Sequence, residues 1–320
     1  MDTKAILNLK NQVVAKYGAW DSNNVYLEDG LYTMGAEIVG DEIKLLRVVQ
    51  CVLDHMGGTV EGKRVLDLGC GEGLYSIEFA RRKALCMAME GREPRAEKVR
   101  FVKQVLSLDN LSVVQDDVRN LSVEKHGQFD VVLCLGILYH LEASDVVSFA
   151  ARLSEVCRNI CIVDTRVALW PKTQYVSDGE TYLGTWGEEH WPGDSEEVKL
   201  SRVGASLDNE RNFWLSRSSI YNLLRNVGFT SVYECHIPAE PTKPGDRITF
   251  VAIKGQPCHL LSAPLMATRP LDDMPEQPHP EYSKTFDLMR NMSHHLPWRA
   301  RRLGKKILGL KGGRTALRNI

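Results

Sequence analysis

A glycine-rich turn that directly follows an apolar run has the clearest chemical meaning in this sequence. The run VLDL at 65–68 leads into Gly69, Gly71 and Gly73, and a helical pattern begins at residue 74. Glycine lets the backbone approach a ligand closely, and the first turn of the helix offers free N–H groups. We therefore expect a ligand at this strand end. The spacing alone does not identify that ligand, because dinucleotide-binding proteins use a related turn for pyrophosphate.

Three carboxylates at strand ends narrow the kind of ligand. Asp67 lies within the apolar run, two residues before the first glycine, where an acid would oppose a pyrophosphate group. Glu90 closes the next run about twenty residues later, where a carboxylate accepts hydrogen bonds from both hydroxyls of a ribose. Asp117 stands in QDDVRNL, after the third run. Glu90 or Asp117 taken singly is better explained as a solvated charge. All three acids at this spacing strongly indicate a binding site for one ligand.

Together these motifs resemble the class I S-adenosylmethionine-dependent methyltransferases, a Rossmann-like family, along residues 60–255. The resemblance implies that Asp67 anchors the methionine part of the cofactor and that Glu90 binds its ribose. It also implies that Asp117 faces the exocyclic amine of the adenine. The implied cofactor is S-adenosylmethionine. The residues assigned to cofactor binding follow the first four strands: Asp67, Gly69, Cys70, Gly71, Glu90, Gly91, Asp117, Val118 and Leu135.

The stretch CLGILYHL at 134–141 follows the fourth apolar run, and in this family it lines the pocket between cofactor and acceptor. Tyr139 and His140 are therefore the candidate active-site residues. Histidine titrates near neutral pH, so His140 is a candidate general base for an oxygen or nitrogen acceptor. The alternative is that His140 caps or packs against the following helix.

A narrower resemblance, to the tRNA wobble-uridine carboxymethyltransferases of the same class, rests on GILYHL, on ERNFWLS at 210–216 and on LLRNVGF at 223–229. That branch uses a carboxylated form of the cofactor, and its carboxylate needs cationic and phenolic partners. Lys44, Tyr139 and Arg247 fall where such partners are expected. The acidic body of the chain and a loosely matching N-terminal region depart from a tRNA-binding pattern.

The region 165–215 interrupts the regular pattern, and we expect it to determine the acceptor. Its mixture of aromatic and polar side chains predicts an aromatic-walled pocket for a small organic molecule or a glycan. The alternative is a small satellite core beneath a long loop. The residues that we assign to the acceptor are Lys44, Trp186, His190, Asn212, Trp214 and Arg247.

The scaffold that positions these residues is predicted by short β-branched runs that alternate with helical patterns from residue 63 onward. Such apolar strands belong to a parallel sheet covered by helices on both faces. Two further strands, near 230–236 and 247–254, predict an antiparallel end. The fold class is therefore α/β, with a doubly wound, mostly parallel seven-stranded sheet whose last strand is antiparallel.

Three parts are expected along the chain. Residues 1–58, with helical patterns at 3–17 and 40–56, form an N-terminal helical cover or lid, and residues 59–256 form the Rossmann-like methyltransferase domain. Residues 257–320 form a Pro-rich strap and a basic amphipathic tail, with nine Lys and Arg and no Asp or Glu from residue 288 onward. This tail is a candidate contact for an anionic membrane or RNA, or it docks on the acidic body of the chain.

Composition excludes several other classes of protein. The content of 43% hydrophobic and 25% charged residues is that of a globular protein. The eight cysteines lack metal-ligand spacing, so we expect free thiols and no metal site. The N-terminus has charged residues where a signal peptide is apolar, which predicts a cytoplasmic protein, with a peripheral membrane contact through the tail as an alternative.

The sequence therefore predicts a methyltransferase that acts on an oxygen or nitrogen atom of a small molecule or glycan. Two alternatives stay open. One is carboxymethyl transfer to a tRNA uridine from the carboxylated cofactor. The other is a cofactor-binding protein without catalysis, whose tail binds a membrane or RNA.

Overall fold

The computed structural model describes residues 1–38, 42–240 and 243–256. The strap and the basic tail expected at 257–320 lie outside the described residues. Within the described part, no helix is both long and apolar enough to cross a bilayer. The seven cysteines of the described part are all free thiols, and five of them are buried.

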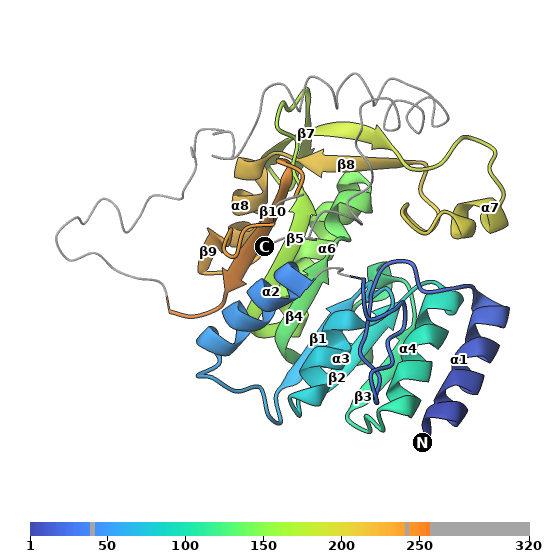
Figure 1. Cartoon of the computed structure of the whole chain (residues 1–320). Coiled ribbons are helices and arrows are strands. Elements are labelled where there is room, and N and C mark those ends of the chain that lie inside the picture. The colour runs from blue at the N-terminus through green and yellow to red at the C-terminus, as the bar shows by residue number, and fades with distance from the viewer. Residues whose placement is uncertain (39–41, 241–242, 257–320) are drawn as a thin grey trace.

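A seven-stranded sheet forms the centre of the molecule, with the strand order β3-β2-β1-β4-β5-β10-β9 (Figure 1). Neighbouring strands from β3 to β5 pair in parallel, whereas β10 is antiparallel to both β5 and β9. The predicted fold class is thus confirmed. The strands are β1 (Arg64–Leu68), β2 (Leu85–Glu90), β3 (Leu111–Gln115), β4 (Phe129–Leu135), β5 (Cys157–Arg166), β9 (Ser231–Glu234) and β10 (Arg247–Ile253).

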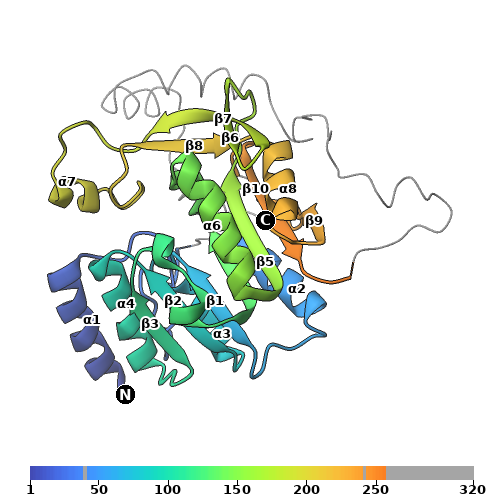
Figure 2. The same ribbon diagram turned by 180° about the vertical axis from the view of Figure 1, so that it is seen from behind.

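Helices cover both faces of the sheet, because successive strand residues point to opposite sides. Val65 packs among residues of α2, α3 and α4, whereas Leu66 and Leu68 pack among residues of α6 and α8. Figures 1 and 2 show the two helical layers from opposite sides, with α1 beside α4 at one end. The helices are α1 (Thr3–Tyr17), α2 (Glu42–His55), α3 (Leu74–Arg81), α4 (Glu93–Val105), α5 (Val123–His126), α6 (Ala143–Val156) and α8 (Arg217–Asn226).

The region 165–215 contains a second sheet, which the sequence pattern did not predict. Strands β6 (Thr173–Ser177), β7 (Glu180–Glu188) and β8 (Arg211–Leu215) pair antiparallel, and α7 (Glu196–Ser201) lies in the connection between β7 and β8. The backbone N–H of Phe213 donates to the carbonyl of Leu141 at 2.9 Å, so β8 is attached to the turn after β4. In both ribbon views this insertion lies beyond the carboxyl ends of the parallel strands.

The N-terminal segment is fixed to the glycine-rich turn by a buried carboxylate. Glu72 accepts hydrogen bonds from the backbone N–H groups of Asp21, Ser22 and Asn23 at 2.9 to 3.2 Å. The ammonium group of Lys98 completes this cluster at 2.9 Å from the same carboxylate. The loop between α1 and α2 therefore holds the turn in place from outside.

Candidate cofactor and acceptor site

The turn between β1 and α3 has the close backbone geometry that the glycines predict. Asp67 is only 1% exposed, and its Oδ2 accepts a hydrogen bond from the backbone N–H of Ser76 at 3.0 Å. Gly69 and Gly71 have φ angles of 58° and 59°, in the left-handed region that favours glycine. A Cβ atom on Gly69 would lie 2.1 Å from Cδ1 of Ile137, so a larger residue does not fit there.

Glu90 reaches the same turn from the end of β2. Its Oε2 accepts from the backbone N–H of Gly71 at 2.9 Å, and its Oε1 accepts from the backbone N–H of Arg92 at 3.0 Å. Each carboxylate oxygen retains a lone pair for a ligand hydroxyl. Burial raises the pKa of Asp67 to about 7, and the nearby charge of Glu90 acts in the same direction.

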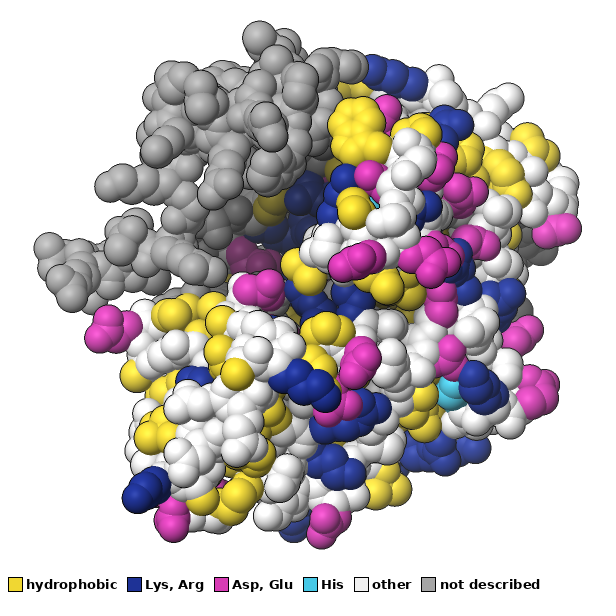
Figure 3. Space-filling model, turned by 90° about the vertical axis from the view of Figure 1, so that its right-hand side faces the viewer, with side chains coloured by type: hydrophobic (Ala, Val, Ile, Leu, Met, Phe, Trp, Pro, Cys, Tyr) yellow, Lys and Arg dark blue, Asp and Glu magenta, His cyan; other side chains and the backbone are white. Residues whose placement is uncertain are grey.

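The insertion closes over this end of the site. A Cβ atom on Gly91 would lie 2.6 Å from Cδ1 of Leu207, so Leu207 rests directly on the backbone after β2. The next side chain, that of Arg92, holds the same loop. Its guanidinium donates hydrogen bonds to the carbonyl groups of Leu200, Arg202, Ala205 and Ser206. In Figure 3, basic side chains appear between the insertion and the body of the molecule.

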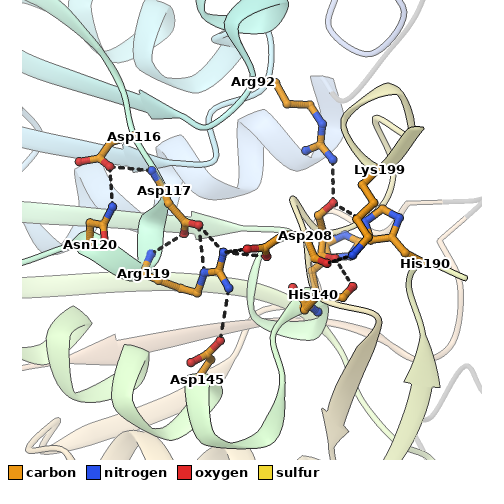
Figure 4. A network of polar contacts seen from close by, with 12 residues as sticks. Arg92, Asp116, Asp117, Arg119, Asn120, His140, Asp145, His190, Lys199 and Asp208 are labelled. Atoms are coloured by element: carbon orange, nitrogen blue, oxygen red, sulfur yellow. Dashed lines mark hydrogen bonds and ion pairs between the residues drawn. The ribbon is translucent and has the colours of Figure 1, made fainter. Parts of the chain in front are cut away.

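Asp117 is part of an ion-pair network between the sheet and the insertion (Figure 4). Its Oδ2 lies 2.5 Å from the guanidinium of Arg119, which also contacts Asp208 at 2.7 Å. Asp117 caps the short helix η1 (Val118–Asn120), and the first residue of that helix, Val118, is buried. The adenine contacts assigned to Asp117 and Val118 remain predictions.

A second charged group lies where β4 and β5 end. Arg247 donates from Nε to Oδ1 of Asp164 at 2.5 Å and from Nη1 to the hydroxyl of Tyr139 at 3.1 Å. A Cβ atom on Gly136, the residue after Leu135, would lie 3.1 Å from Nη2 of Arg247. Burial alone would raise the pKa of Asp164, but positive charges, that of Arg247 first, hold it below its usual range.

Of the three residues expected to bind a carboxylate, two are thus in direct contact, namely Tyr139 and Arg247. Lys44 lies in α2, and its ammonium group is 5.9 Å from the centre of the Tyr75 ring. Its charge also contributes to the lowered pKa of Asp164. Lys44 therefore acts on the same cluster from α2, whereas Tyr139 belongs to the turn after β4 and Arg247 to β10.

His140 is bound to the insertion through a buried carboxylate. The Nδ1 atom of His140 lies 2.8 Å from Oε1 of Glu189, whose side chain is 5% exposed. Ser206 donates its backbone N–H to Oε2 of Glu189 at 2.7 Å, and the side-chain amide of Asn212 donates to Oε1. The rings of Tyr139 and His140 lie 4.2 Å apart.

The other residues assigned to the acceptor separate into two groups. The Trp214 ring lies 6.1 Å from the Tyr139 ring, and the guanidinium of Arg166 lies over both rings. In contrast, Trp186 packs against Phe213 inside the insertion, with ring centres 5.0 Å apart. The structure brings Trp214 to the turn that carries Tyr139 and His140 and gives Trp186 the packing of a satellite core.

His190 and Asn212 also face the inside of the insertion. His190 is 4% exposed, and its Nε2 lies 2.9 Å from the carbonyl oxygen of Ser206. The side-chain amide of Asn212 donates to Glu189, the residue that contacts His140. Within the described residues, no group of three or more His, Cys, Asp or Glu side chains is arranged to hold a metal ion.

Comparison with known proteins places this geometry in a class. Residues 65–159 match a family model described as a methyltransferase domain. The N-terminal domain of EvdMO1, solved in the presence of SAH and D-fucose, is similar with a TM-score of 0.60 and 21% identity, over 79% of this chain and 97% of that one. The chain has the fold of the class I S-adenosylmethionine-dependent methyltransferases, with a methyltransferase-domain match at residues 65–159.

Curated relatives of this methyltransferase domain include ubiquinone biosynthesis O-methyltransferases. The protein from Acinetobacter baumannii (strain AYE) is 34% identical over 89 residues, which are 28% of this chain and 38% of that protein. The protein from Rhodopseudomonas palustris (strain TIE-1) is 29% identical over 140 residues, or 41% of this chain and 52% of that protein. The matches therefore span about half of these relatives or less.

The residues of the methyltransferase domain fit the cofactor of this class. The turn with two left-handed glycines leaves backbone at its surface, and Glu90 presents acceptor oxygens at the neighbouring strand end. Asp67 supplies a buried carboxylate beside them. Sequence reasoning missed Arg92 and Leu207 in the cover of this site, because their partners are about a hundred residues away along the chain.

Proposed function

We propose that this chain transfers a methyl group from S-adenosylmethionine to an oxygen or nitrogen atom of a small hydroxylated molecule or a sugar. The observation that carries the proposal is the position of His140. It follows β4 in the turn that begins beside Gly69 and ends beneath β8, so it lies between the cofactor turn and the insertion.

The residues then have separable roles. The cofactor supplies a methyl group that its sulfonium already activates. Asp67 holds the methionine part of the cofactor, Glu90 holds its ribose, and Leu207 excludes water above Gly91. His140 removes the proton of the acceptor group at Nε2, because Nδ1 is bound to Glu189. Alignment of the acceptor with the methyl group accounts for the remainder of the rate enhancement.

The side chains that lie beside His140 favour a small ring-shaped acceptor. Trp214 and Tyr139 meet edge to face, and Arg166 covers both rings. Aromatic faces beside a cation suit a hydroxylated ring, which offers an apolar face and polar edges. The similar proteins point the same way, since one was solved with D-fucose and others are ubiquinone biosynthesis O-methyltransferases.

The test is methyl transfer by the purified full chain. Methyl-labelled S-adenosylmethionine is incubated with separate panels of hydroxylated aromatic compounds and of deoxysugars, and labelled product is counted. We expect label in an acceptor of one panel and formation of S-adenosylhomocysteine in equal amount. Tight cofactor binding without transfer to any acceptor class, macromolecules included, would favour the non-catalytic alternative.

Glu90→Gln tests the ribose contact. The amide keeps the volume of the side chain but replaces one acceptor oxygen by a donor, which faces either a ribose hydroxyl or a backbone N–H. We expect a loss of about 1–3 kcal/mol in binding of S-adenosylhomocysteine, measured by calorimetry. Unchanged affinity would place the ribose contact elsewhere.

The pH dependence of cofactor binding tests Asp67. Burial raises the pKa of Asp67 to about 7, so its carboxyl group is protonated below that pH and ionised above it. Only the ionised form attracts the ammonium group of the cofactor. The affinity for S-adenosylhomocysteine should therefore rise with pH up to about 7, by at most about tenfold per pH unit. Asp67→Asn should bind more weakly and lose this dependence; the same pH profile in both proteins would contradict the assignment.

A carboxylated cofactor is the second candidate, and the contact between Arg247 and Tyr139 favours it. The guanidinium lies beside Gly136, within 3.1 Å of the phenolic oxygen, and Lys44 acts on the same cluster. Native mass spectrometry of the ligand that co-purifies with the full chain separates the candidates, because the carboxylated cofactor is heavier. An S-adenosylmethionine mass and equal activity in Arg247→Gln would remove this second candidate.

A further inference from the structure

Glu189 is a buried carboxylate that joins the candidate base to the insertion. It follows the last residue of β7, and its two oxygens accept from two elements besides the His140 ring. These are the backbone N–H of Ser206, in the loop after α7, and the amide of Asn212, in β8. A carboxylate removed from water in this way needs such donors to remain ionised.

The contact fixes which nitrogen of His140 is free. A carboxylate only accepts hydrogen bonds, so Nδ1 carries the hydrogen and Nε2 keeps its lone pair. The negative charge also stabilises the imidazolium that forms when Nε2 takes a proton. This is the arrangement by which a buried acid orients a histidine base in hydrolytic triads.

We propose that Glu189 is the positioning residue of His140, and that it makes the base depend on the docked insertion. This inference rests on the proposed function of His140 as the base. Glu189 itself does not reach the cofactor turn, because its contacts are with His140, Ser206 and Asn212.

The same loop that supplies Ser206 also covers the cofactor side. The carbonyl group of Ser206 accepts from Arg92 at 2.8 Å, and Leu207 rests on Gly91. Asn209 donates its side-chain amide to the carbonyl of His140 at 2.8 Å. One loop therefore both covers the cofactor side and holds the residues that orient the base. Figure 4 shows Arg92, His140 and Asp208 around this junction.

The charged groups around the pair include two basic side chains, those of Arg92 and Arg166. Arg92 is close enough to Glu189 for the carboxylate to act electrostatically on its guanidinium. Arg166 lies over the ring of Tyr139, which is itself 4.2 Å from the His140 ring. Each cation also has another acid beside it, Glu90 for Arg92 and Asp246 for Arg166. Removal of the charge at Glu189 therefore acts by taking away the anion that stabilises a protonated His140.

Glu189→Gln is the first test, with Glu188→Gln as its control. The amide keeps the shape of the side chain, but its NH2 group must face either Ser206 or His140, both of which donate. We expect kcat to fall on the order of 10²-fold, the lower end of what general acid–base catalysis supplies, with KM for the acceptor little changed, and the acidic limb of the kcat profile to move to lower pH. Glu188 is exposed and adjacent in sequence, so Glu188→Gln should leave all three unchanged.

Two further measurements separate this inference from the proposed function. In the double variant His140→Ala/Glu189→Gln, the second change should add no further loss, because Glu189 acts through His140. Nitrogen-15 spectra of the ligand-free full chain at alkaline pH should show the Nδ1–H form of His140 in the wild type and less of it in Glu189→Gln.

Each outcome decides one claim. Full turnover in His140→Ala would remove the proposed base. A large loss in His140→Ala together with wild-type turnover, pH profile and tautomer in Glu189→Gln would overturn the role of Glu189 alone. If Glu189→Gln lowers thermal stability and turnover but leaves the pH profile and the tautomer unchanged, Glu189 only packs the insertion and the inference is wrong.

Discussion

Methyl transfer by His140→Ala should be slower than wild type by about 10²–10⁴-fold, the range that general acid–base catalysis supplies. The physical reason is that His140 acts on the acceptor proton and not on the cofactor. Its Nδ1 is bound to Glu189, and its ring packs at a tilt against the Tyr139 ring, so Nε2 is the nitrogen that we assign to the acceptor. The affinity for S-adenosylhomocysteine should stay close to that of the wild type.

The measurement pairs single-turnover rates with calorimetry on the same preparations. His55→Ala is the matched control, because His55 is exposed at the end of α2 and lies outside the site. It should change neither quantity. Equal losses of rate and cofactor affinity in His140→Ala would show that His140 packs the turn instead of moving a proton.

Gly71→Val should reduce the affinity for S-adenosylhomocysteine by about 100-fold or more. A β-branched residue at φ 59° is strained by about 1–3 kcal/mol. Its Cβ would lie 3.1 Å from Nη1 of Arg95. Because the backbone N–H of Gly71 also holds Glu90, a shifted turn moves the carboxylate that we assign to the ribose.

Gly62→Val provides a control with the same kind of strain. Gly62 has a φ of 69°, and a Cβ there would meet open space. It precedes β1 and therefore lies at the amino ends of the parallel strands, opposite the glycine-rich turn. Both variants should lose thermal stability to a similar extent, but only Gly71→Val should lose affinity for the cofactor. Matching affinities in the two variants would mean that the turn is structural and that the cofactor lies elsewhere.

The main sheet was predictable because its signals are local. Apolar runs mark β1, β2 and β4, and α1 was predicted at its observed bounds of residues 3–17. The three-stranded sheet of the insertion was missed because its strands carry little of the usual burial pattern. Most residues of β6 and β7 are exposed or half-buried, so alternation between apolar and polar residues is weak there.

The geometry of the glycine-rich turn was predictable for a related reason, whereas the contacts of His140 were not. Gly69 and Gly71 shape the turn through their backbone, and Glu90 stands at the end of its strand. Both features leave a local pattern in the sequence. The bond between His140 and Glu189 spans 49 positions and leaves no such pattern. Trp186 was assigned to the acceptor from its place among the aromatic and polar residues of the insertion, and that pattern does not predict its contact with Phe213.

A crystal structure of the full chain with S-adenosylhomocysteine tests the central claim most directly. We expect both ribose hydroxyls within hydrogen-bonding distance of the Glu90 carboxylate and the methionine part over the turn at Gly69 and Gly71. The sulfur atom should face the side of the pocket that carries Tyr139 and His140. A ligand bound away from the carboxyl ends of β1 and β2, or with its sulfur directed away from His140, would contradict the account.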